Sequence, residues 1–334
     1  MIRSIEWNGM HAVEFSKGDY TALLIPGVGA NLVRLANVRL GIEILRTPKP
    51  EEVENFKTRP HVYGLPLLLP PNRIAGARFE FEGREYRFPV TIPTEGAFHH
   101  GVIKSQPFMV SKAIETDDEV LIEARFYSNA ANDVIFRDFP HEFKCKMIFR
   151  LSNRGLEHSV VFFNRSDRDM PIGVGYHTPL NVPFMPGGTG DDYRLTLSAG
   201  EQWLLTEKYL PGEQRIALSG AFEHLADQQG IIPTGHGAIS AAFTLKPIEI
   251  DGKEYRGAII RNIVNGHRVF YRVDDRARYW TLWNNGGEVP WICPEPMSWA
   301  TNAPNMRNLP DSLTGFSFIP PAGKWSMTSW LHAE

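Results

Sequence analysis

Apolar and polar residues alternate along several short segments of the chain. The clearest segment runs from Phe143 to Leu151, where apolar side chains occupy every second position until Ile148 interrupts the polar face. Alternation of period two is typical of a strand with one buried face. Residues 152–155, Ser-Asn-Arg-Gly, then predict a turn, and strand-like composition resumes from Leu156 to Phe163. These segments predict an antiparallel hairpin whose turn is longer than the minimal one.

Further segments of strand-like composition follow one another along the chain, whereas helical patterns are sparse. The strand-like segments are Thr21–Ile25, Val120–Tyr127, Tyr193–Leu197, His267–Val273 and Tyr279–Trp283. A single short helix is predicted from about Pro50 to Lys57, because proline suits a first helical turn and Glu51 and Glu52 lie near its positive end. With 29 glycines and 25 prolines between short strands, the chain is predicted to be an all-β, antiparallel β-sandwich with long loops.

The 334 residues are predicted to form one domain, 1–334, since no linker or shift in composition divides the chain. The segment Met185–Asp191 holds three glycines and is therefore a candidate mobile loop that could cover a bound ligand. Residues 27–32, Gly-Val-Gly-Ala-Asn-Leu, lack the third glycine and the following helix of a dinucleotide site, so they predict a turn between strands.

Composition and charge limit the kinds of molecule that the protein is expected to bind and the compartment in which it is expected to lie. The formal net charge of -3 and the mixed signs argue against nucleic acid. No apolar run approaches the ~20 residues that span a bilayer, and the first residues lack a secretory pattern, which favours a cytoplasmic protein that does not enter membranes. The two cysteines, Cys145 and Cys293, are predicted to be reduced and buried. Neither a cofactor nor a metal is predicted, since the usual nucleotide and zinc motifs are missing from the sequence.

Four residues carry the predicted chemistry. Glu295 stands between two prolines, on a backbone too constrained to move freely, which suits a positioned base. His177 lies in a loop flanked by glycine and proline, and Arg73 lies before a hairpin predicted to turn at Glu82-Gly83. His99 and His100 are adjacent and would point in opposite directions in an extended segment, so we expect a single one of them to face the site.

Aromatic residues are frequent near Glu295. Aromatic faces stack well on sugar rings, but core packing is an equally good interpretation of each tryptophan, and the pattern does not choose among them. The four are Trp280, Trp283, Trp291 and Trp299. Two imidazoles, a carboxylate and a guanidinium together predict a site for a small, hydroxyl-rich ligand, a sugar.

Ordered motifs in the chain resemble those of the aldose 1-epimerase, or galactose mutarotase, family. They are N-R-I-A-G-A from Asn72, F-H-H-G-V from Phe98, N-R-S-D-R-D-M-P-I-G-V-G-Y-H-T-P from Asn164, P-G-E from Pro211, and E-P-M-S-W-A-T-N-A-P-N from Glu295. The resemblance implies a large antiparallel β-supersandwich with an open sugar cleft. It implies Glu295 as general base and His177 as general acid, with Arg73 and His100 holding the sugar and no cofactor.

Two departures from the family pattern concern the substrate. His177 is followed by Thr178-Pro179-Leu180 where many members carry P-Y-F, and residues 239–245 hold no counterpart of the aspartate that usually contacts sugar hydroxyls. The predicted function is interconversion of α and β anomers by a monomer or homodimer. The alternatives are a hexose-6-phosphate mutarotase, with Arg78, Arg84 and Arg87 as added charge, a non-catalytic sugar-binding or sensing protein, and a glycosidase or lyase, which would need a second carboxylate near Glu295.

Overall fold

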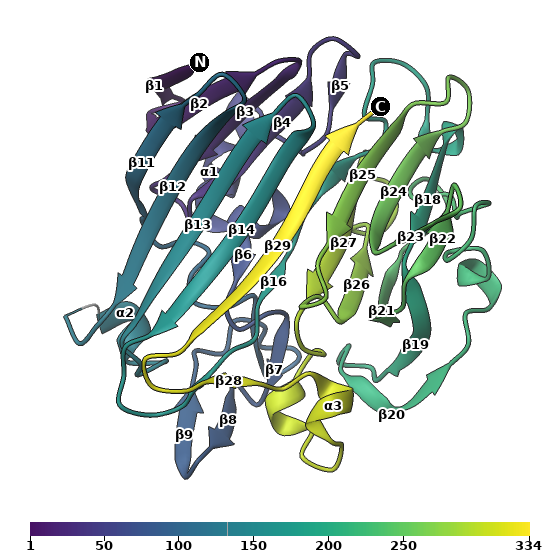
Figure 1. Cartoon of the computed structure of the whole chain (residues 1–334). Coiled ribbons are helices and arrows are strands. Elements are labelled where there is room, and N and C mark those ends of the chain that lie inside the picture. Colours follow the sequence, from purple (N-terminus) through teal and green to yellow (C-terminus); the bar gives the residue numbers. More distant parts are fainter. Residues whose placement is uncertain (132) are drawn as a thin grey trace.

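The computed structural model describes residues 1–131 and 133–334. Antiparallel strands dominate this part of the chain and form three main sheets (Figure 1). The front sheet of Figure 1 contains, in spatial order, β11 (Met109–Glu115), β12 (Glu119–Ser128), β13 (Phe143–Ser152), β14 (Gly155–Asn164), β29 (Lys324–Ala333), β25 (Arg268–Val273), β24 (Gly257–Asn262) and β18 (Tyr193–Leu197). The predicted all-β, antiparallel class is therefore confirmed.

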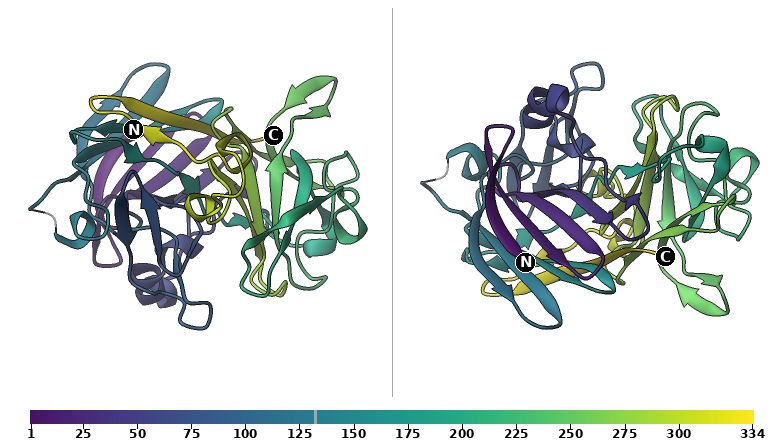
Figure 2. Two further views of the ribbon diagram at one scale, coloured as in Figure 1. Left: turned by 90° about the horizontal axis from the view of Figure 1, so that it is seen from below. Right: turned by 90° about the horizontal axis from the view of Figure 1, so that it is seen from above.

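Two further sheets lie behind the front one. The N-terminal sheet is β1 (Ile2–Trp7), β2 (Met10–Lys17), β3 (Tyr20–Ile25), β4 (Asn31–Asn37) and β5 (Ile42–Glu43). The other is β20 (Pro211–Ile216), β19 (Ala199–Leu205), β21 (Ser240–Leu245), β26 (Tyr279–Trp283), β27 (Trp291–Met297), β16 (Gly175–Tyr176) and β6 (Leu67–Leu68), with β17 (Leu180–Asn181) also paired to β27. Figure 2 shows the N-terminal strands behind β11–β14 and the β19–β27 strands behind β18–β25.

Short pairs of strands and short helices connect these sheets. The pairs are β7 (Arg73–Ala75) with β10 (Ala97–His99), β8 (Arg78–Phe81) with β9 (Arg84–Arg87), β15 (Met170–Pro171) with β28 (Phe318–Ile319), and β22 (Ile248–Ile250) with β23 (Lys253–Tyr255). The α-helices are α1 (Val53–Thr58), α2 (Asp133–Phe136) and α3 (Asp311–Thr314), and the 3-10 helices are η1 (Pro50–Glu52), η2 (Pro60–Val62), η3 (Gly190–Asp192), η4 (Gly220–Phe222) and η5 (Ala303–Asn305). The predicted helix corresponds to η1 and α1, but the expectation of a single helix was wrong.

The predicted hairpin is β13 with β14. Buried and half-buried residues alternate along all of β13, as the pattern indicated. The expected long turn was wrong, because β13 continues to Ser152 and β14 begins at Gly155, which leaves two residues between them. Gly155 has φ +101, and a side chain there would collide with the carbonyl of Leu331 on the neighbouring β29. Glycine thus allows the strand to start one residue earlier than its apolar pattern shows.

The layers pack through large apolar side chains. Tyr271 of β25 meets Trp280 of β26 edge to face, with ring centroids 6.4 Å apart, which joins the front sheet to the sheet behind it. Cys145 and Cys293 are buried and unbridged, as expected. None of the helices in the described chain is both long and apolar enough to cross a membrane.

Candidate active site

The site is built where strand pairing along β27 is interrupted. Gly175 pairs with Met297 on one side of the gap, and Leu180 pairs with Ile292 on the other. These two pairs belong to the same antiparallel register, so residue 177 comes directly opposite residue 295. The ladder bonds are missing between the pairs, and here β27 carries Pro294 and Pro296, which have no N–H to donate. The proline-flanked segment therefore presents Glu295 to His177 across a break in the sheet.

His177 and Glu295 form a buried pair. Their Nε2 and Oε1 atoms are 3.3 Å apart, and the side chains are 3% and 2% exposed. The remaining polar atoms, Nδ1 of His177 and Oε2 of Glu295, are buried without a hydrogen-bond partner in the described part of the chain. The two residues singled out from the sequence as acid and base are thus in direct contact.

Burial reverses the usual protonation preferences of this pair. It lowers the pKa of His177 to about 3, and the main-chain carbonyls of His177 and His61 oppose this shift. It raises the pKa of Glu295 well above its ordinary value, and the positive charge of Arg73 works in the other direction. The ordinary values alone would place a proton on the histidine and none on the glutamate. In the buried site a neutral imidazole and a protonated carboxyl are favoured instead, because the charged forms lose their hydration.

Arg73 is held beside the pair by two partners. Its guanidinium donates to both carboxylate oxygens of Glu95, over 2.6 and 3.2 Å, and Tyr209 covers it with a ring centroid 5.0 Å from Cζ. The preceding Asn72 accepts from the Arg73 main-chain N–H and donates to the hydroxyl of Thr281. Thr281 lies directly opposite Glu295 on β26. Asn72 therefore ties the β7 segment, and Arg73 with it, to the strand that carries the carboxyl group.

The adjacent histidines do not diverge as expected. His100 has φ +62, so the segment leaves the extended conformation in which neighbours point to opposite sides. The rings of His99 and His100 lie next to each other, with centroids 3.3 Å apart and planes tilted by 30°. The left-handed turn is continued by Gly101 at φ +68, where a side chain would strike the backbone of Leu69. The expectation that the two side chains point in opposite directions was wrong for this conformational reason, and of the two rings His100 contacts that of His177, with centroids 4.8 Å apart.

A fourth histidine joins the cluster, and sequence reasoning missed it. His61, on η2, lies with its ring centroid 4.7 Å from that of His100 and 5.5 Å from that of His177. Burial lowers the pKa of His61, His99 and His100 well below the ordinary value. No motif marks His61 in the sequence. Within residues 1–131 and 133–334, no three histidine, cysteine or acidic side chains are placed to hold a metal ion.

The cluster leaves several buried polar atoms without partners in the described chain. They are Nδ1 of His61, Nε2 of His99, Nδ1 of His100, Nδ1 of His177 and Oε2 of Glu295. Most buried polar groups in folded proteins are hydrogen-bonded, and an unpaired one costs about 1–3 kcal/mol. Their concentration in one place indicates a site completed by a ligand or by water. Neutral imidazoles and hydroxyl-binding carboxyl oxygens suit a ligand that carries many hydroxyls.

The structure distinguishes the four tryptophans near Glu295. Trp283 is half-buried and meets the ring of His177 at 5.2 Å, so it forms a wall of the site. Trp291 lies between Trp283 and the guanidinium of Arg46. Trp280 packs in the core, and Trp299 stacks on Phe316 in a separate apolar cluster.

Two features considered from the sequence, the arginines near Arg73 and the glycine-rich loop, have their contacts outside the histidine cluster. Arg78 and Arg87 pair with Glu85 on the exposed β8–β9 hairpin, and Arg84 donates to the carbonyl of Pro140. The hairpin turns at Glu82-Gly83 as expected, but its arginines are engaged elsewhere. The glycine-rich loop, residues 185–191, contacts Asn265 through Met185 and His236 through Asp191 rather than the histidine cluster.

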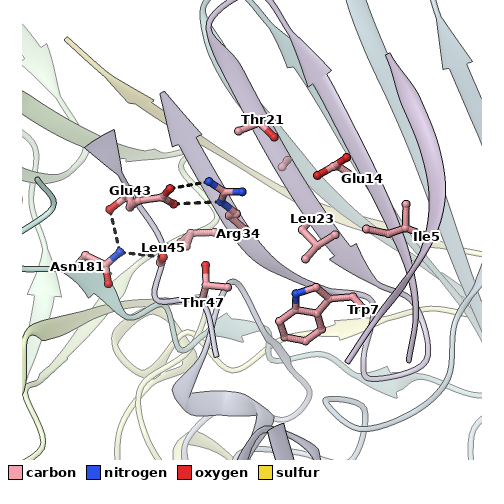
Figure 3. Close-up of a pocket in the computed structure, with 11 residues that line it drawn as sticks. Ile5, Trp7, Glu14, Thr21, Leu23, Arg34, Glu43, Leu45, Thr47 and Asn181 are labelled. Atoms are coloured by element: carbon pink, nitrogen blue, oxygen red, sulfur yellow. Dashed lines mark hydrogen bonds and ion pairs between the residues drawn. The ribbon is translucent and has the colours of Figure 1, made fainter. Parts of the chain in front are cut away.

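A separate cavity of 390 Å³ lies on the N-terminal sheet and holds none of the four predicted site residues. Figure 3 shows Trp7, Leu23 and Ile5 on one side of it and the paired Arg34 and Glu43 on the other. The Arg34 guanidinium donates to both carboxylate oxygens of Glu43, so the main charges of this wall satisfy each other. The predicted site residues lie around Glu295 and do not line this cavity.

Comparisons with known proteins agree with the geometry. The family model described as aldose 1-epimerase matches residues 11–311. The chain belongs to this family. The structure of a galactose mutarotase-like protein from Clostridium acetobutylicum is 34% identical and superposes with a TM-score of 0.96, covering 100% of this chain and 98% of that one. The galactose 1-epimerase of Lactobacillus acidophilus shares the fold at 16% identity, with a TM-score of 0.73 over 100% of this chain and 98% of that one.

A relative with a curated sequence matches part of the chain. Protein LacX of Lactococcus lactis is 23% identical to this aldose 1-epimerase family member over 207 residues, which is 62% of this chain and 67% of LacX. The resemblance noted in the ordered motifs is thus confirmed at the level of the family, together with its galactose mutarotase-like antiparallel fold.

Proposed function

We propose that the protein is an aldose 1-epimerase that interconverts the α and β anomers of an uncharged aldose. The observation that carries the proposal is the buried contact of 3.3 Å between His177 Nε2 and Glu295 Oε1. Anomer exchange needs one group to take a proton from the anomeric hydroxyl and another to give a proton to the ring oxygen. A carboxyl and an imidazole in contact can supply both.

In the proposed reaction the pair carries one proton. The empty site favours that proton on Glu295, but substrate hydroxyls that donate to the carboxyl group would stabilise its ionised form. Glu295 then takes the proton of the anomeric hydroxyl while His177 protonates the ring oxygen, and the hemiacetal opens. Rotation about C1–C2 and closure with the reverse proton movements give the other anomer.

An uncharged sugar fits the charges around the site better than a phosphorylated one. The guanidinium of Arg73 is already matched by the carboxylate of Glu95, with the side chains 16% and 14% exposed. Of the arginines considered for a phosphate, Arg78 and Arg87 pair with Glu85, and Arg84 donates to the carbonyl of Pro140. We therefore propose that Arg73 and His100 bind sugar hydroxyls and that a hexose 6-phosphate is not the preferred substrate.

The proposal is tested by polarimetry of freshly dissolved α-D-galactose, α-D-glucose and their 6-phosphates, at a pH where the uncatalysed change is slow. Native protein is expected to accelerate mutarotation of at least one neutral aldose. Glu295→Gln and His177→Asn are each expected to reduce kcat by about 10²-fold or more, since each removes a positioned acid or base. Glu213→Gln, which changes an exposed carboxylate paired with Asn308, serves as the control and should retain the native rate.

Circular dichroism would establish that each variant is folded. If native protein leaves every aldose and aldose phosphate unaffected but sugars raise its Tm, the enzyme proposal fails and a sugar-binding protein takes its place. Faster turnover of a 6-phosphate than of the neutral sugar would overturn the substrate assignment alone.

A further inference from the structure

We propose that His61 is a positioning residue that keeps His177 turned toward Glu295 and closed off from water; this inference rests on the proposed function. Its ring contacts two histidines of the cluster at once. It lies over His100, with centroids 4.7 Å apart and planes tilted by 37°, and meets His177 edge to face at 5.5 Å and 83°. Neither the sequence motifs nor the family comparison assigns a role to this residue.

Aromatic rings from three segments surround His177. Trp283 of β26, His100 after β10 and His61 of η2 each meet its ring edge to face, with centroids 5.2, 4.8 and 5.5 Å away. These aromatic neighbours leave the imidazole 3% exposed. Removal of one ring would open a space beside His177 that water could fill, since the surrounding groups are polar.

The main chain at His61 also acts on His177. The carbonyl groups of His61 and of His177 itself favour the protonated form of the imidazole and oppose the lowering of its pKa by burial.

The turn that presents His61 is rigidly built. Asn31, fully buried, donates to the carbonyls of Pro60 and Tyr63 and accepts from the N–H of Leu65. Arg46 donates to the carbonyl of Val62 from the other side. These bonds enclose η2 before and after His61. The buried amide of Asn31 thus bonds one carbonyl before His61 and one after it. Such an arrangement is expected where a side chain must be held in a fixed position.

The charged and titratable groups that face His61 come from several elements. They are His99, His100 and Lys104 from the segment that ends β10, His177 from the gap beside β27, and Arg59 from the residue before η2. Lys104 donates to the carbonyl of Gly101, and burial lowers its pKa to about 8. All of these are neutral or cationic, so a protonated His61 would be repelled from every side, and it can act here as an uncharged ring.

The test compares His61→Ala with His61→Phe, which keeps a planar ring without its nitrogens. Steady-state kinetics would be combined with NMR titration of ¹⁵N-labelled histidines, in which His177→Asn identifies the His177 signal. His61→Ala is expected to lower kcat by roughly 10–100-fold with KM changed by less than about threefold, because misplacement of a catalytic group costs rate more than binding. The pKa of His177 should rise toward its ordinary value as water enters. His61→Phe should retain kcat within about threefold and keep the His177 pKa low.

His141→Ala is the matched control, because His141 is a fully buried histidine that stacks on Tyr86 away from the site. It should reduce stability without changing the His177 pKa or kcat. If His61→Ala does not fold, His61→Val takes its place, because valine is smaller than histidine and still leaves space beside His177.

The proposal would be overturned if His61→Ala kept both the native kcat and the native pKa of His177. It would also be overturned if His61→Phe lost as much activity as His61→Ala. The NMR titration does not depend on turnover. If native protein has no mutarotase activity, the proposed function fails, while the effect of His61 on the His177 signal still decides whether this residue encloses it.

Discussion

At the scale of single residues, the protonation of the proposed catalytic pair, His177 and Glu295, depends on burial more than on the ordinary pKa values of the two groups. The sequence indicates a histidine acid and a glutamate base with nearly suitable pKa values. Enclosure lowers the pKa of His177 and raises that of Glu295. The two residues exchange preferences, yet their combined charge stays the same, since one proton is shared between them. What the site requires is therefore one proton on the pair, whichever atom holds it.

This sharing predicts a broad pH optimum. At low pH activity is lost when His177 gains a second proton, and its pKa of about 3 places that step well below the ordinary value near 6.5. At high pH activity is lost when Glu295 gives up the shared proton, at a pKa raised above its ordinary range. We expect kcat/KM, which reports the pKa values of the free enzyme, to vary less than about threefold from pH 5.5 to 7.

Initial rates of anomer exchange, corrected for the blank at each pH, would measure this profile. An acid limb centred near pH 6.5, at a pH where circular dichroism shows folded protein, would contradict the burial argument.

Arg73→Lys tests the proposed role of Arg73 in sugar binding. A lysine loses the forked contact with Glu95, so the substitution should raise KM more than it lowers kcat.

At the scale of elements, Asn31 holds the short η2 turn, and with it the proposed positioning residue His61. Asn31→Ala would leave the carbonyls of Pro60 and Tyr63 without their donor and the N–H of Leu65 without its acceptor. We expect the free energy of unfolding to fall by about 3 kcal/mol. We also expect kcat to fall by about tenfold, because η2 would no longer hold His61 against His177.

Asn164 offers a control with the same hydrogen bonds in another place. It donates to the carbonyls of Arg168 and Ile319 and accepts from the N–H of Ser166. Asn164→Ala should lower stability by a similar amount in urea titrations but leave kcat near the native value. Equal kinetic losses in the two variants would show that general destabilisation, not the position of η2, explains the effect.

Elements differ in how far the sequence predicts them. Alternation along residues 143–151 predicts β13 because the strand has one buried face, and the prolines around Glu295 mark a constrained strand. The contact between the His99 and His100 rings was not predicted. It depends on the left-handed backbone conformation of His100, which no local sequence pattern signals. His61 escaped because its place in the site comes from contacts with residues about 40 and 116 positions away, and such tertiary contacts leave no periodic trace.

At the scale of the whole molecule, the sandwich brings distant parts of the chain to one gap in a sheet. β27 provides Glu295, the interrupted strand opposite it provides His177, β7 provides Arg73, and His100 directly follows β10. The same packing buries many titratable groups away from water. The imidazoles of His141 and His158 lie outside the catalytic pair, and burial lowers their pKa to about 4 and about 3. The fold therefore holds several histidines neutral.

Because these buried histidines are neutral in the folded protein, they lower the free energy of unfolding as the pH falls. Between about pH 4 and 6.5 the unfolded chain binds protons at His141, His158 and His177 that the folded chain does not. Their stabilising effect is complete above pH 6.5 and is lost as the pH falls, by about 1.4 kcal/mol per pH unit for each histidine. Glu295 and Asp274, whose pKa values are raised, act with the opposite sign and offset part of this loss.

Urea titrations from pH 7 to 5 should therefore show a steep fall in the free energy of unfolding. His158→Phe is expected to be less stable at pH 7, because Tyr176 loses its hydrogen-bond partner, but its slope against pH should be shallower by about 1.4 kcal/mol per unit. His224→Asn removes an exposed imidazole whose pKa is raised by Asp227, so the acid slope should not flatten. If His158→Phe has the same acid slope as the native protein, His158 gains its proton alike in the folded and unfolded chains, and the burial argument is wrong for this residue.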